Sequence, residues 1–179
     1  MIKLVVFDLD GVLVEARDFH YEALNRALAS FNEKYIISRE EHLSTYDGLN
    51  TSKKLWKLSQ TKGLSLDVHD EIWKRKQEST HSVIKEKVKP EDHLAIAALL
   101  KKLKDEGYMV YCASNSIRSS VKLMLIRAGY IEYIDEYFSN EDVKSPKPHS
   151  EIYLKCMLTA GVNPKECLIV EDSHIGRKA

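Results

Sequence analysis

The fold is decided by residues 2–12, which have the sequence Ile2-Lys3-Leu4-Val5-Val6-Phe7-Asp8-Leu9-Asp10-Gly11-Val12. The apolar run before Asp8 is short and rich in β-branched residues, which predicts a strand buried on both faces at the centre of a parallel sheet. Two carboxylates, Asp8 and Asp10, then follow at the carboxyl end of this strand, where open α/β sheets bind their ligands. Asp is also a common turn residue, so these two acids alone are equally consistent with the start of an ordinary loop.

The composition limits which classes of protein are compatible with the chain. Its 179 residues suffice for one core domain and a modest insertion. Lys and Arg together number 27, and so do Asp and Glu, which leaves no basic footprint for nucleic acid or for an anionic membrane. The first apolar run is too short for a membrane span or a signal peptide. Cys112, Cys156 and Cys167 show no metal-ligand spacing, so we expect reduced cysteines in a cytoplasmic protein.

Residues 15–88 have the pattern of a separate helical domain. Apolar residues recur at helical spacing from Phe19 to Phe31, and amphipathic helical segments continue to about Lys89 without a convincing strand. About four helices placed directly behind a central strand are too many for a single crossover connection. We therefore predict a separate helical domain at residues 15–88, inserted into an α/β core made of residues 1–14 and 89–179.

Three further strands are predicted in the core. Residues 108–113 and 167–170 are buried apolar runs, and residues 136–139 form a shorter one. Helices are predicted between them: one that opens at Pro90, one at about residues 117–128, and one from Ser150 to Ala160. This alternation is that of βα units, so the predicted fold class is α/β with a Rossmann-like parallel sheet.

Polar residues follow each predicted strand, or the loop after it, and they are Asp8, Asp10, Ser114, Asn115, Lys147, Glu171 and Asp172. Because right-handed crossovers bring the carboxyl ends of parallel strands to one edge of the sheet, we expect these groups to converge. Each has an ordinary alternative: Ser114 as a helix cap, Lys147 as a solvated loop charge, and the acidic pair as a helix start. Four loops that meet by accident are the weaker explanation.

The four polar motifs, in this order, resemble those of the haloacid dehalogenase superfamily of phosphotransferases. The matching stretches run over essentially the whole chain, and they are Phe7–Val12, Ala113–Ser116, Lys147–Tyr153 and Val170–Ser173. The predicted helices between the first two motifs are similar to the helical cap of the branch that contains phosphoglycolate phosphatases and β-phosphoglucomutases. The resemblance therefore implies phosphoryl-transfer chemistry on an α/β core with a cap.

The resemblance also implies a role for each polar residue of the core. Asp8 would attack phosphorus and form an aspartyl phosphate. Asp10 would protonate the leaving oxygen and later take a proton from the hydrolytic water. Lys147 would place its charge on the phosphate and the nucleophile. Ser114 and Asn115 would bind the phosphate, together with the amides that open the next helix.

A Mg²⁺ cofactor follows from the same resemblance. Its ligands would be Asp8, the backbone carbonyl of Asp10, and Asp172, with Glu171 as a further or outer-shell ligand, because Mg²⁺ prefers oxygen and keeps several waters. Dehalogenase relatives lack an acid at the position of Asp10, whereas phosphatases and mutases need one for an oxygen leaving group. The expected substrate is therefore a small phosphorylated metabolite.

Residues of the predicted cap that would approach the substrate or the acid are His20, Gly48, Asn50, Thr51, Lys53, Arg75 and Lys76. Thr51 and Lys76 are our candidates for substrate or phosphate binding. Related mutases resemble one another in having, at the position of Thr51, an arginine for a second phosphate. A lysine elsewhere cannot replace this arginine, because its ammonium is a point charge and cannot bind phosphate in the bidentate way of a guanidinium. This favours a phosphatase over a β-phosphoglucomutase-like mutase. The structural alternatives are a packed His20 and a solvated helix face for Arg75 and Lys76.

Three other functions stay open from the sequence alone. The first is the sugar-phosphate mutase. The second is a catalytically idle binding module, because relatives continue past Ala179 with a helix and at least one more strand, whose loss would leave a sheet edge bare. The third is a signalling receiver domain, which also uses a strand-end acid, a hydroxyl and a lysine, although the helical insertion and the acidic pair argue against it. We expect a monomer or a weak dimer.

Overall fold

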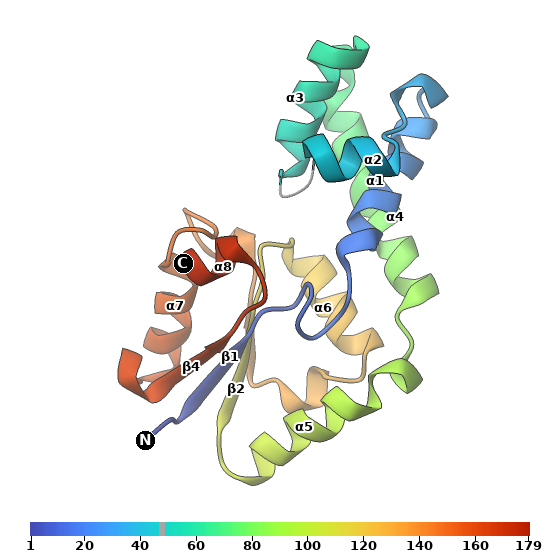
Figure 1. Cartoon of the computed structure of the whole chain (residues 1–179). Helices are drawn as coiled ribbons and strands as arrows, with labels where there is room; N and C mark the ends of the chain where they lie inside the picture. Colours follow the sequence, from blue (N-terminus) through green and yellow to red (C-terminus); the bar gives the residue numbers. More distant parts are fainter. Residues whose placement is uncertain (47–48) are drawn as a thin grey trace. The chain divides into compact units, whose positions relative to one another are not determined.

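The computed structural model describes residues 1–46 and 49–179, which divide into two compact units (Figure 1). The α/β unit comprises Met1–Ala16 and Lys85–Ala179, and the helical unit comprises Arg17–Ile84. The helical unit is thus a continuous segment between two parts of the α/β unit. Its interpretation as a cap that serves the site stays a prediction.

A four-stranded parallel sheet forms the centre of the α/β unit. The strands are β1 (Leu4–Phe7), β2 (Met109–Ala113), β3 (Glu136–Phe138) and β4 (Cys167–Val170), in the order β3-β2-β1-β4. Strand β1 pairs in parallel with both β2 and β4, so that Leu4 lies opposite Met109 on one side and Cys167 on the other. The predicted α/β class with a Rossmann-like parallel sheet is confirmed.

The apolar run at the start of the chain explains the central place of β1. All four of its residues are buried, as expected for a strand that helices cover on both faces. Leu4 and Val6 point to the same face because side chains alternate along a strand. There they pack in one cluster with residues of β2, β3 and α7 (Glu151–Ala160), namely Tyr111, Ala113, Phe138, Ile152, Tyr153 and Cys156.

Helices alternate with the strands of the α/β unit in the expected order. Helix α5 (Leu94–Asp105) precedes β2, α6 (Arg118–Arg127) and α7 lie in the connections that follow β2 and β3, and α8 (His174–Lys178) follows β4. Short 3₁₀ turns lie at Pro90–His93, Ile131–Tyr133, Asn140–Asp142 and Pro164–Glu166. Figure 1 shows α7 on one side of the sheet and α5 and α6 on the other. Helix α7 ends at Gly161, whose φ of +66° suits glycine.

The predicted start of one helix at Pro90 is wrong in detail. Residues Pro90–His93 form a 3₁₀ turn, and His93 has a non-helical backbone conformation with φ −119° and ψ 9°. The α-helix therefore begins only at Leu94.

The helical unit contains α1 (Arg17–Ala29), the single turn α2 (Arg39–Glu41), α3 (Thr51–Lys62) and α4 (His69–Lys87), the last of which continues into the α/β unit. Between them lie 3₁₀ turns at Glu33–Tyr35 and Leu66–Val68 and a π-helical turn at His42–Tyr46. Asn50 caps the start of α3, with its side chain accepting a hydrogen bond from the Lys53 amide, and Gly63, with φ +67°, follows its last residue.

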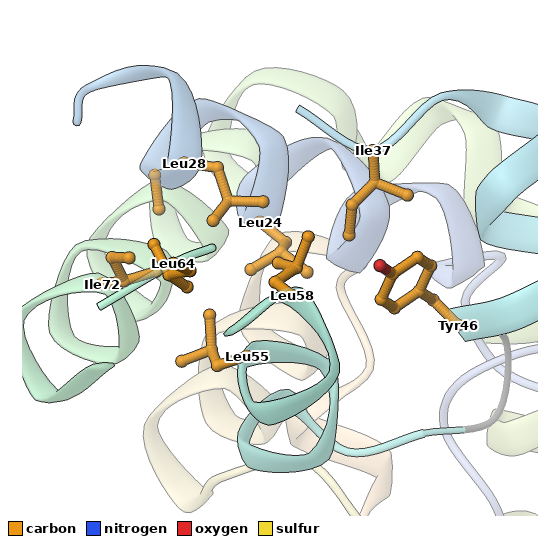
Figure 2. Packing of buried hydrophobic residues seen from close by; sticks show 9 residues of the cluster. Leu24, Leu28, Ile37, Tyr46, Leu55, Leu58, Leu64 and Ile72 are labelled. Carbon is orange, nitrogen blue, oxygen red and sulfur yellow. The ribbon is translucent and has the colours of Figure 1, made fainter. Parts of the chain in front are cut away.

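Leucines dominate the core of the helical unit. Figure 2 shows this cluster, in which Leu24 and Leu28 of α1 meet Leu55 and Leu58 of α3. The other buried members are Ala27, Ile37, Tyr46, Leu64 and Ile72. Residues three or four apart on one helix lie on the same face, so each helix contributes a stripe to a shared core. This unit has an apolar core of its own, separate from that under the sheet.

Two further sequence expectations concern the whole chain. Cys112 and Cys156 are buried, Cys167 is half-buried, and all three are free thiols. In the described part of the chain, none of the helices has the length and hydropathy that a membrane crossing requires.

Candidate active site

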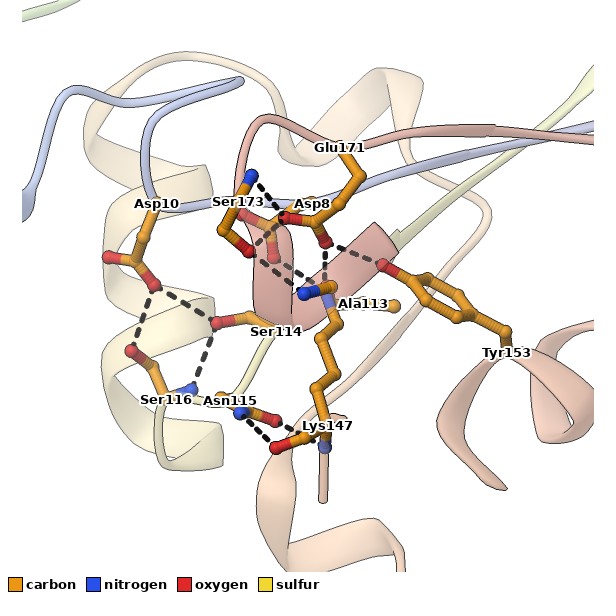
Figure 3. A network of polar contacts seen from close by, with 11 residues as sticks. Asp8, Asp10, Ala113, Ser114, Asn115, Ser116, Lys147, Tyr153, Glu171 and Ser173 are labelled. Atoms are coloured by element: carbon orange, nitrogen blue, oxygen red, sulfur yellow. Dashed lines mark hydrogen bonds and ion pairs between the residues drawn. The ribbon is translucent and has the colours of Figure 1, made fainter. Parts of the chain in front are cut away.

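The carboxyl edge of the sheet brings together side chains from four separate segments. Asp8 follows β1, Ser114 follows β2, Glu171 follows β4, and Lys147 comes from the loop that leads into α7. Figure 3 shows these residues around one point, joined by hydrogen bonds and ion pairs. The predicted convergence of strand-end residues is thus present in the geometry.

Lys147 lies at the middle of this network. Its Nζ donates to Asp8 Oδ1 at 2.6 Å, to Glu171 Oε2 at 2.7 Å and to the Ala113 carbonyl at 2.9 Å. The Lys147 side chain is only 3% exposed. A buried ammonium needs acceptors for its three N–H groups, and these three atoms supply them. The alternative of a solvated loop charge does not hold for Lys147.

The side-chain amide of Asn115 holds the backbone of Lys147 in place. Asn115 Nδ2 donates to the Lys147 carbonyl at 3.1 Å, and the Lys147 amide donates to Asn115 Oδ1 at 3.0 Å. The next peptide bond, Lys147-Pro148, is cis. We expected Asn115 to bind phosphate, but both polar atoms of its amide bond to Lys147 in this geometry.

Burial and charge act in opposite directions on the ion pair of Asp8 with Lys147. Burial raises the pKa of Asp8 to about 7, although the charge and hydrogen bond of Lys147 act to lower it. Burial acts to lower the pKa of Lys147, but the charge and hydrogen bond of Asp8, together with Tyr153 and Glu171, outweigh it and leave the pKa above its ordinary value. Asp8 is therefore a desolvated carboxyl whose ionised form depends on nearby positive charge.

Asp10 is held by hydroxyl groups from the loop after β2. Its Oδ2 accepts from Ser114 Oγ at 3.1 Å and from Ser116 Oγ at 3.0 Å. Ser114 Oγ in turn accepts from the Ser116 amide at 3.0 Å. Asp8 and Asp10, two residues apart, thus have different partners: the first meets an ammonium, the second meets two hydroxyls.

Glu171 and Asp172 complete the site after β4. Carboxylate oxygens of Asp8, Glu171 and Asp172 lie within 4.8 Å of one another. Mg²⁺ holds carboxylate oxygens at about 2.0–2.1 Å, so this donor set fits one such ion after a small contraction. The donor chemistry, oxygen alone, also matches Mg²⁺ rather than a softer metal.

Gly11 makes room for one of these acids. Its φ of +102° favours glycine, and a Cβ added there would overlap the carboxylate of Asp172. The Gly11 amide also donates to the Val14 carbonyl at 2.8 Å, which closes the turn after Asp10. A side chain at this position would displace Asp172 from the acidic cluster.

The predicted substrate-binding residues of residues 15–88 lie in the helical unit. Thr51 is half-buried at the start of α3. Lys76 is buried in α4, with Nζ 3.5 Å from His20 Nδ1, so it is not part of a solvated face.

The other cap candidates have local partners or lie outside the described residues. Arg75 pairs with Glu71, donates to Ser30 Oγ and lies over the ring of Phe31. Asn50 caps α3 and Lys53 is exposed. Gly48 belongs to the residues that the structure does not describe.

Three residues of the network were not assigned a role from the sequence. Ser116 bonds to Asp10, while Tyr153 and Ser173 both bond to Glu171. Ser116 and Ser173 each close one of the matched motifs, and Tyr153 lies in the motif of Lys147. Motif membership was the available signal, but their partners depend on how the loops meet.

Comparison with known families decides how this geometry is to be interpreted. A family model described as haloacid dehalogenase-like hydrolase matches residues 5–179. The chain belongs to this family. The resemblance of the four motifs is confirmed by a match over nearly the whole sequence.

Relatives of this haloacid dehalogenase-like hydrolase include plant and bacterial proteins. A haloacid dehalogenase-like hydrolase domain-containing protein of Arabidopsis thaliana is 28% identical over 99% of this chain; the match spans 65% of that relative, less than two thirds of its length. A fructose-1-phosphate phosphatase of Escherichia coli is 24% identical, over 98% of this chain and 89% of the relative.

Solved structures show the same fold. The crystal structure of β-phosphoglucomutase from Clostridium difficile superposes with a TM-score of 0.79 at 24% identity, and the match covers 98% of this chain and 78% of that one. At this identity the likeness establishes the fold of our haloacid dehalogenase-like hydrolase, and its substrate has to be argued from the site.

Proposed function

We propose that the chain is a Mg²⁺-dependent phosphatase that hydrolyses a small phosphorylated metabolite through an aspartyl phosphate at Asp8. The observation that carries this proposal is a buried carboxyl, 2.6 Å from a buried ammonium, within an acidic cluster at the end of a parallel sheet. A desolvated carboxylate next to fixed positive charge is suited to attack an anionic phosphate that the same charge neutralises. Family membership and the phosphatase among the relatives support the assignment.

In the first step, an oxygen of Asp8 attacks phosphorus. A new bond forms between this oxygen and phosphorus as the bond from phosphorus to the ester oxygen breaks. The leaving alkoxide oxygen takes the proton of Asp10, whose carboxyl oxygen already accepts from two hydroxyls that fix its orientation.

In the second step, water hydrolyses the aspartyl phosphate. Asp10, now a carboxylate, takes a proton from the water as its oxygen attacks phosphorus. The bond between phosphorus and Asp8 breaks, which releases phosphate and regenerates both acids for another cycle. Asp10 thus acts as acid and then as base, as microscopic reversibility requires for two opposite half-reactions.

The remaining site residues bind and orient the phosphate. Lys147 neutralises charge on the phosphate oxygens, and the amides at the start of α6 donate hydrogen bonds to them. Ser114 has one O–H, which bonds to Asp10 in this geometry, so it would donate to phosphate only after leaving Asp10 to Ser116. Asn115 acts through Lys147, whose backbone it holds. Thr51 and Lys76 of the helical unit are proposed to contact the rest of the substrate.

Asp8, Asp172 and the Asp10 carbonyl would hold Mg²⁺, with Glu171 as a further or outer-shell ligand. The ion, when bound, supplies positive charge that stabilises the transferring phosphoryl group and favours ionised Asp8. We also expect the protein to act in the cytoplasm as a monomer or a weak dimer.

Mutase activity is the second candidate. Sequence likeness to a β-phosphoglucomutase of Bacillus subtilis, 27% identical over 99% of this chain, favours it, whereas Thr51, in place of an arginine for a second phosphate, argues against it. The two differ in product: a phosphatase releases inorganic phosphate, and a mutase gives an isomer without net release.

The test is Asp8→Asn assayed for phosphate release over a panel of phosphorylated metabolites with Mg²⁺. We expect turnover to fall by at least about 10³-fold, since the amide cannot form the covalent intermediate. Asp105→Asn is the matched control, because the Asp105 side chain is 62% exposed and lies in α5, away from the strand ends. Retained turnover in Asp8→Asn, with an unchanged melting curve, would contradict the proposal.

A further inference from the structure

The backbone turn that carries Asp10 runs from Leu9 to Val14 and is closed by its own hydrogen bonds. The Leu13 and Val14 amides both donate to the Leu9 carbonyl, at 3.1 and 2.9 Å, and the Gly11 amide donates to the Val14 carbonyl at 2.8 Å. Leu9, Leu13 and Val14 are buried. Because the turn is closed in this way, its far end and Asp10 move together.

A tyrosine from another part of the α/β unit holds the far end of this turn. The Tyr130 hydroxyl donates to the Leu13 carbonyl at 3.1 Å, across 117 residues. Tyr130 follows α6 and is fully buried, and its own amide donates to the Leu125 carbonyl at 2.8 Å. Burial raises the pKa of Tyr130 to about 12, so the hydroxyl stays protonated and able to donate. The buried Leu13 carbonyl therefore has the donor that it needs.

His93 bonds to the same hydroxyl. Its Nδ1 lies 2.9 Å from the Tyr130 oxygen, and the two rings meet edge to face with their centroids 5.5 Å apart. A tyrosine hydroxyl has one hydrogen, and a carbonyl can only accept. That hydrogen is used on Leu13, so His93 must carry a proton on Nδ1 and donate it to the tyrosine oxygen. Two hydrogen bonds in series thus run from His93 through Tyr130 to the turn of Asp10.

Asp10 is therefore fixed at two levels. The hydroxyls of Ser114 and Ser116 orient its carboxyl, as Figure 3 shows, and Tyr130 fixes the backbone turn that carries it. From these contacts we propose that Tyr130, supported by His93, is a positioning residue that keeps the acid and base Asp10 in reach of the leaving oxygen. The inference rests on the proposed function, in which Asp10 protonates that oxygen.

The leaving group provides a measure of how well Asp10 is placed. A strongly basic leaving oxygen needs the proton of a general acid more than a weakly basic one does. Phenyl phosphate and p-nitrophenyl phosphate are similar in size, but phenolate is much the stronger base. Single-turnover release of each phenol, with enzyme in excess over substrate and Mg²⁺ present, measures the first step alone. The ratio of the two rates, phenyl over p-nitrophenyl, does not depend on the fraction of enzyme that is folded.

This ratio tests the positioning by Tyr130. Tyr130→Phe removes only the hydroxyl, and we expect the ratio to fall about 3- to 10-fold, the size of one net hydrogen bond. Tyr111→Phe is the control, since it removes the hydroxyl of another buried tyrosine, in β2, and should leave the ratio unchanged. A purely structural role would lower both rates equally. Equal ratios in Tyr130→Phe and Tyr111→Phe would overturn the proposal.

His93 variants test the second hydrogen bond of the series. His93→Leu removes the donor to Tyr130, and we expect the ratio to fall by about threefold. His93→Asn keeps an N–H on a short side chain and should restore the ratio to that of the wild type. If Asn fails to restore a ratio that Leu has lowered, the hydrogen bond of His93 has no part in the positioning.

Hydrogen exchange tests the turn without any need for turnover. In Tyr130→Phe we expect the amides of Gly11, Leu13 and Val14 to exchange about 3- to 10-fold faster than in the wild type, with those of β4 unchanged. Unchanged exchange in the turn would overturn the proposal. Fast exchange throughout the chain would mean that Tyr130→Phe unfolds, and His93→Leu then decides by the same two measurements.

The two proposals fail in different ways. A wild type that releases neither phenol contradicts the proposed function, and faster exchange in Tyr130→Phe still assigns Tyr130 to the turn. An active wild type whose ratio is unchanged in Tyr130→Phe leaves the phosphatase in place and removes the positioning role.

Discussion

In each of the two units, an asparagine side chain makes two hydrogen bonds to the backbone of one distant residue. In the helical unit, Asn25 Nδ2 donates to the Ile37 carbonyl and the Ile37 amide donates to Asn25 Oδ1, across 12 residues. In the α/β unit, Asn115 makes the same pair of bonds to Lys147, across 32 residues. Ile37 is an apolar member of the helical core, whereas Lys147 carries the central charge of the site. A side-chain amide can therefore fix either a core residue or a functional cation, and only the residue it holds tells which.

The largest expected effect on stability comes from removing the charge of Lys147, whose backbone Asn115 holds. Lys147→Met leaves the carboxylates of Asp8 and Glu171 buried without their cation, and we expect the free energy of unfolding to fall by about 3–5 kcal/mol at pH 8. Chemical denaturation measures this. Lys102→Met is the control because the Lys102 side chain is 74% exposed. A loss no greater than that of the control would show that Lys147 is not the electrostatic centre of the unit.

The two asparagines, Asn25 and Asn115, can be compared directly by removing their side-chain amides. Asn25→Ala and Asn115→Ala each remove two hydrogen bonds to backbone, so each should lower the free energy of unfolding by about 1–2 kcal/mol. The difference should appear in turnover, where Asn115→Ala lowers kcat because Lys147 is displaced and Asn25→Ala leaves it unchanged. Denaturation curves and phosphate release on the same samples provide both numbers. Equal kcat values for the two variants would mean that the hydrogen bonds of Asn115 have no part in placing Lys147.

The smallest expected effect on stability concerns two carboxylates, one from each unit, that accept hydrogen bonds at the start of short turns. Asp142 pairs with Arg118 and bonds to Ser139, while Glu41 pairs with Lys62 and bonds to Ser38. Burial acts to raise the pKa of Asp142, but the bonds from Ser139 and the charge of Arg118 outweigh it, and the pKa is lowered. The pKa of Glu41 is also lowered, chiefly by the hydrogen bond from the Ser38 amide.

Lowered carboxyl pKa values stabilise the folded state above the unfolded values of about 4, and this stabilisation is lost as pH falls through the folded values. We expect Asp142→Asn to cost about 1 kcal/mol at pH 6 and less at pH 3. Glu41→Gln should cost less, because the Glu41 side chain is more exposed, at 40% against 21%. Unfolding curves across this pH range measure both. A cost that grows toward pH 3 would contradict the sign.

Much of the fold and of the site geometry could be predicted because it follows from strand order. Asp8, Ser114 and Glu171 end neighbouring strands of one parallel sheet, so their meeting needs only the right-handed connections that such sheets share. The apolar run in residues 2–12 predicted a central strand, and the position of β1 between β2 and β4 confirms this prediction. Gly63 and Gly161 likewise end α3 and α7, where glycine is expected after a helix.

The parts that sequence could not predict depend on contacts between loops. The bonds of Asn115 to the Lys147 backbone, and of Ser116 to Asp10, join loops that are 32 and 106 residues apart. No local periodicity encodes such pairs, since they depend on the path that each loop takes. Lys76 illustrates the same limit, because its place on an amphipathic helix allowed a solvated face and the side chain is in fact buried.

The pairing of β4 with β1 also sets the order in which the site is assembled during synthesis. Leu4 pairs with Cys167 and Phe7 with Val170, so more than 150 further residues must be synthesised before one edge of β1 has its partner strand. Asp8 leaves the ribosome more than 150 residues before Glu171 and Asp172. A nascent chain thus carries Asp8 without its acidic partners, and contacts of such long sequence separation form slowly. Pairing of β4 with β1 is therefore the event that closes the acidic cluster around Asp8.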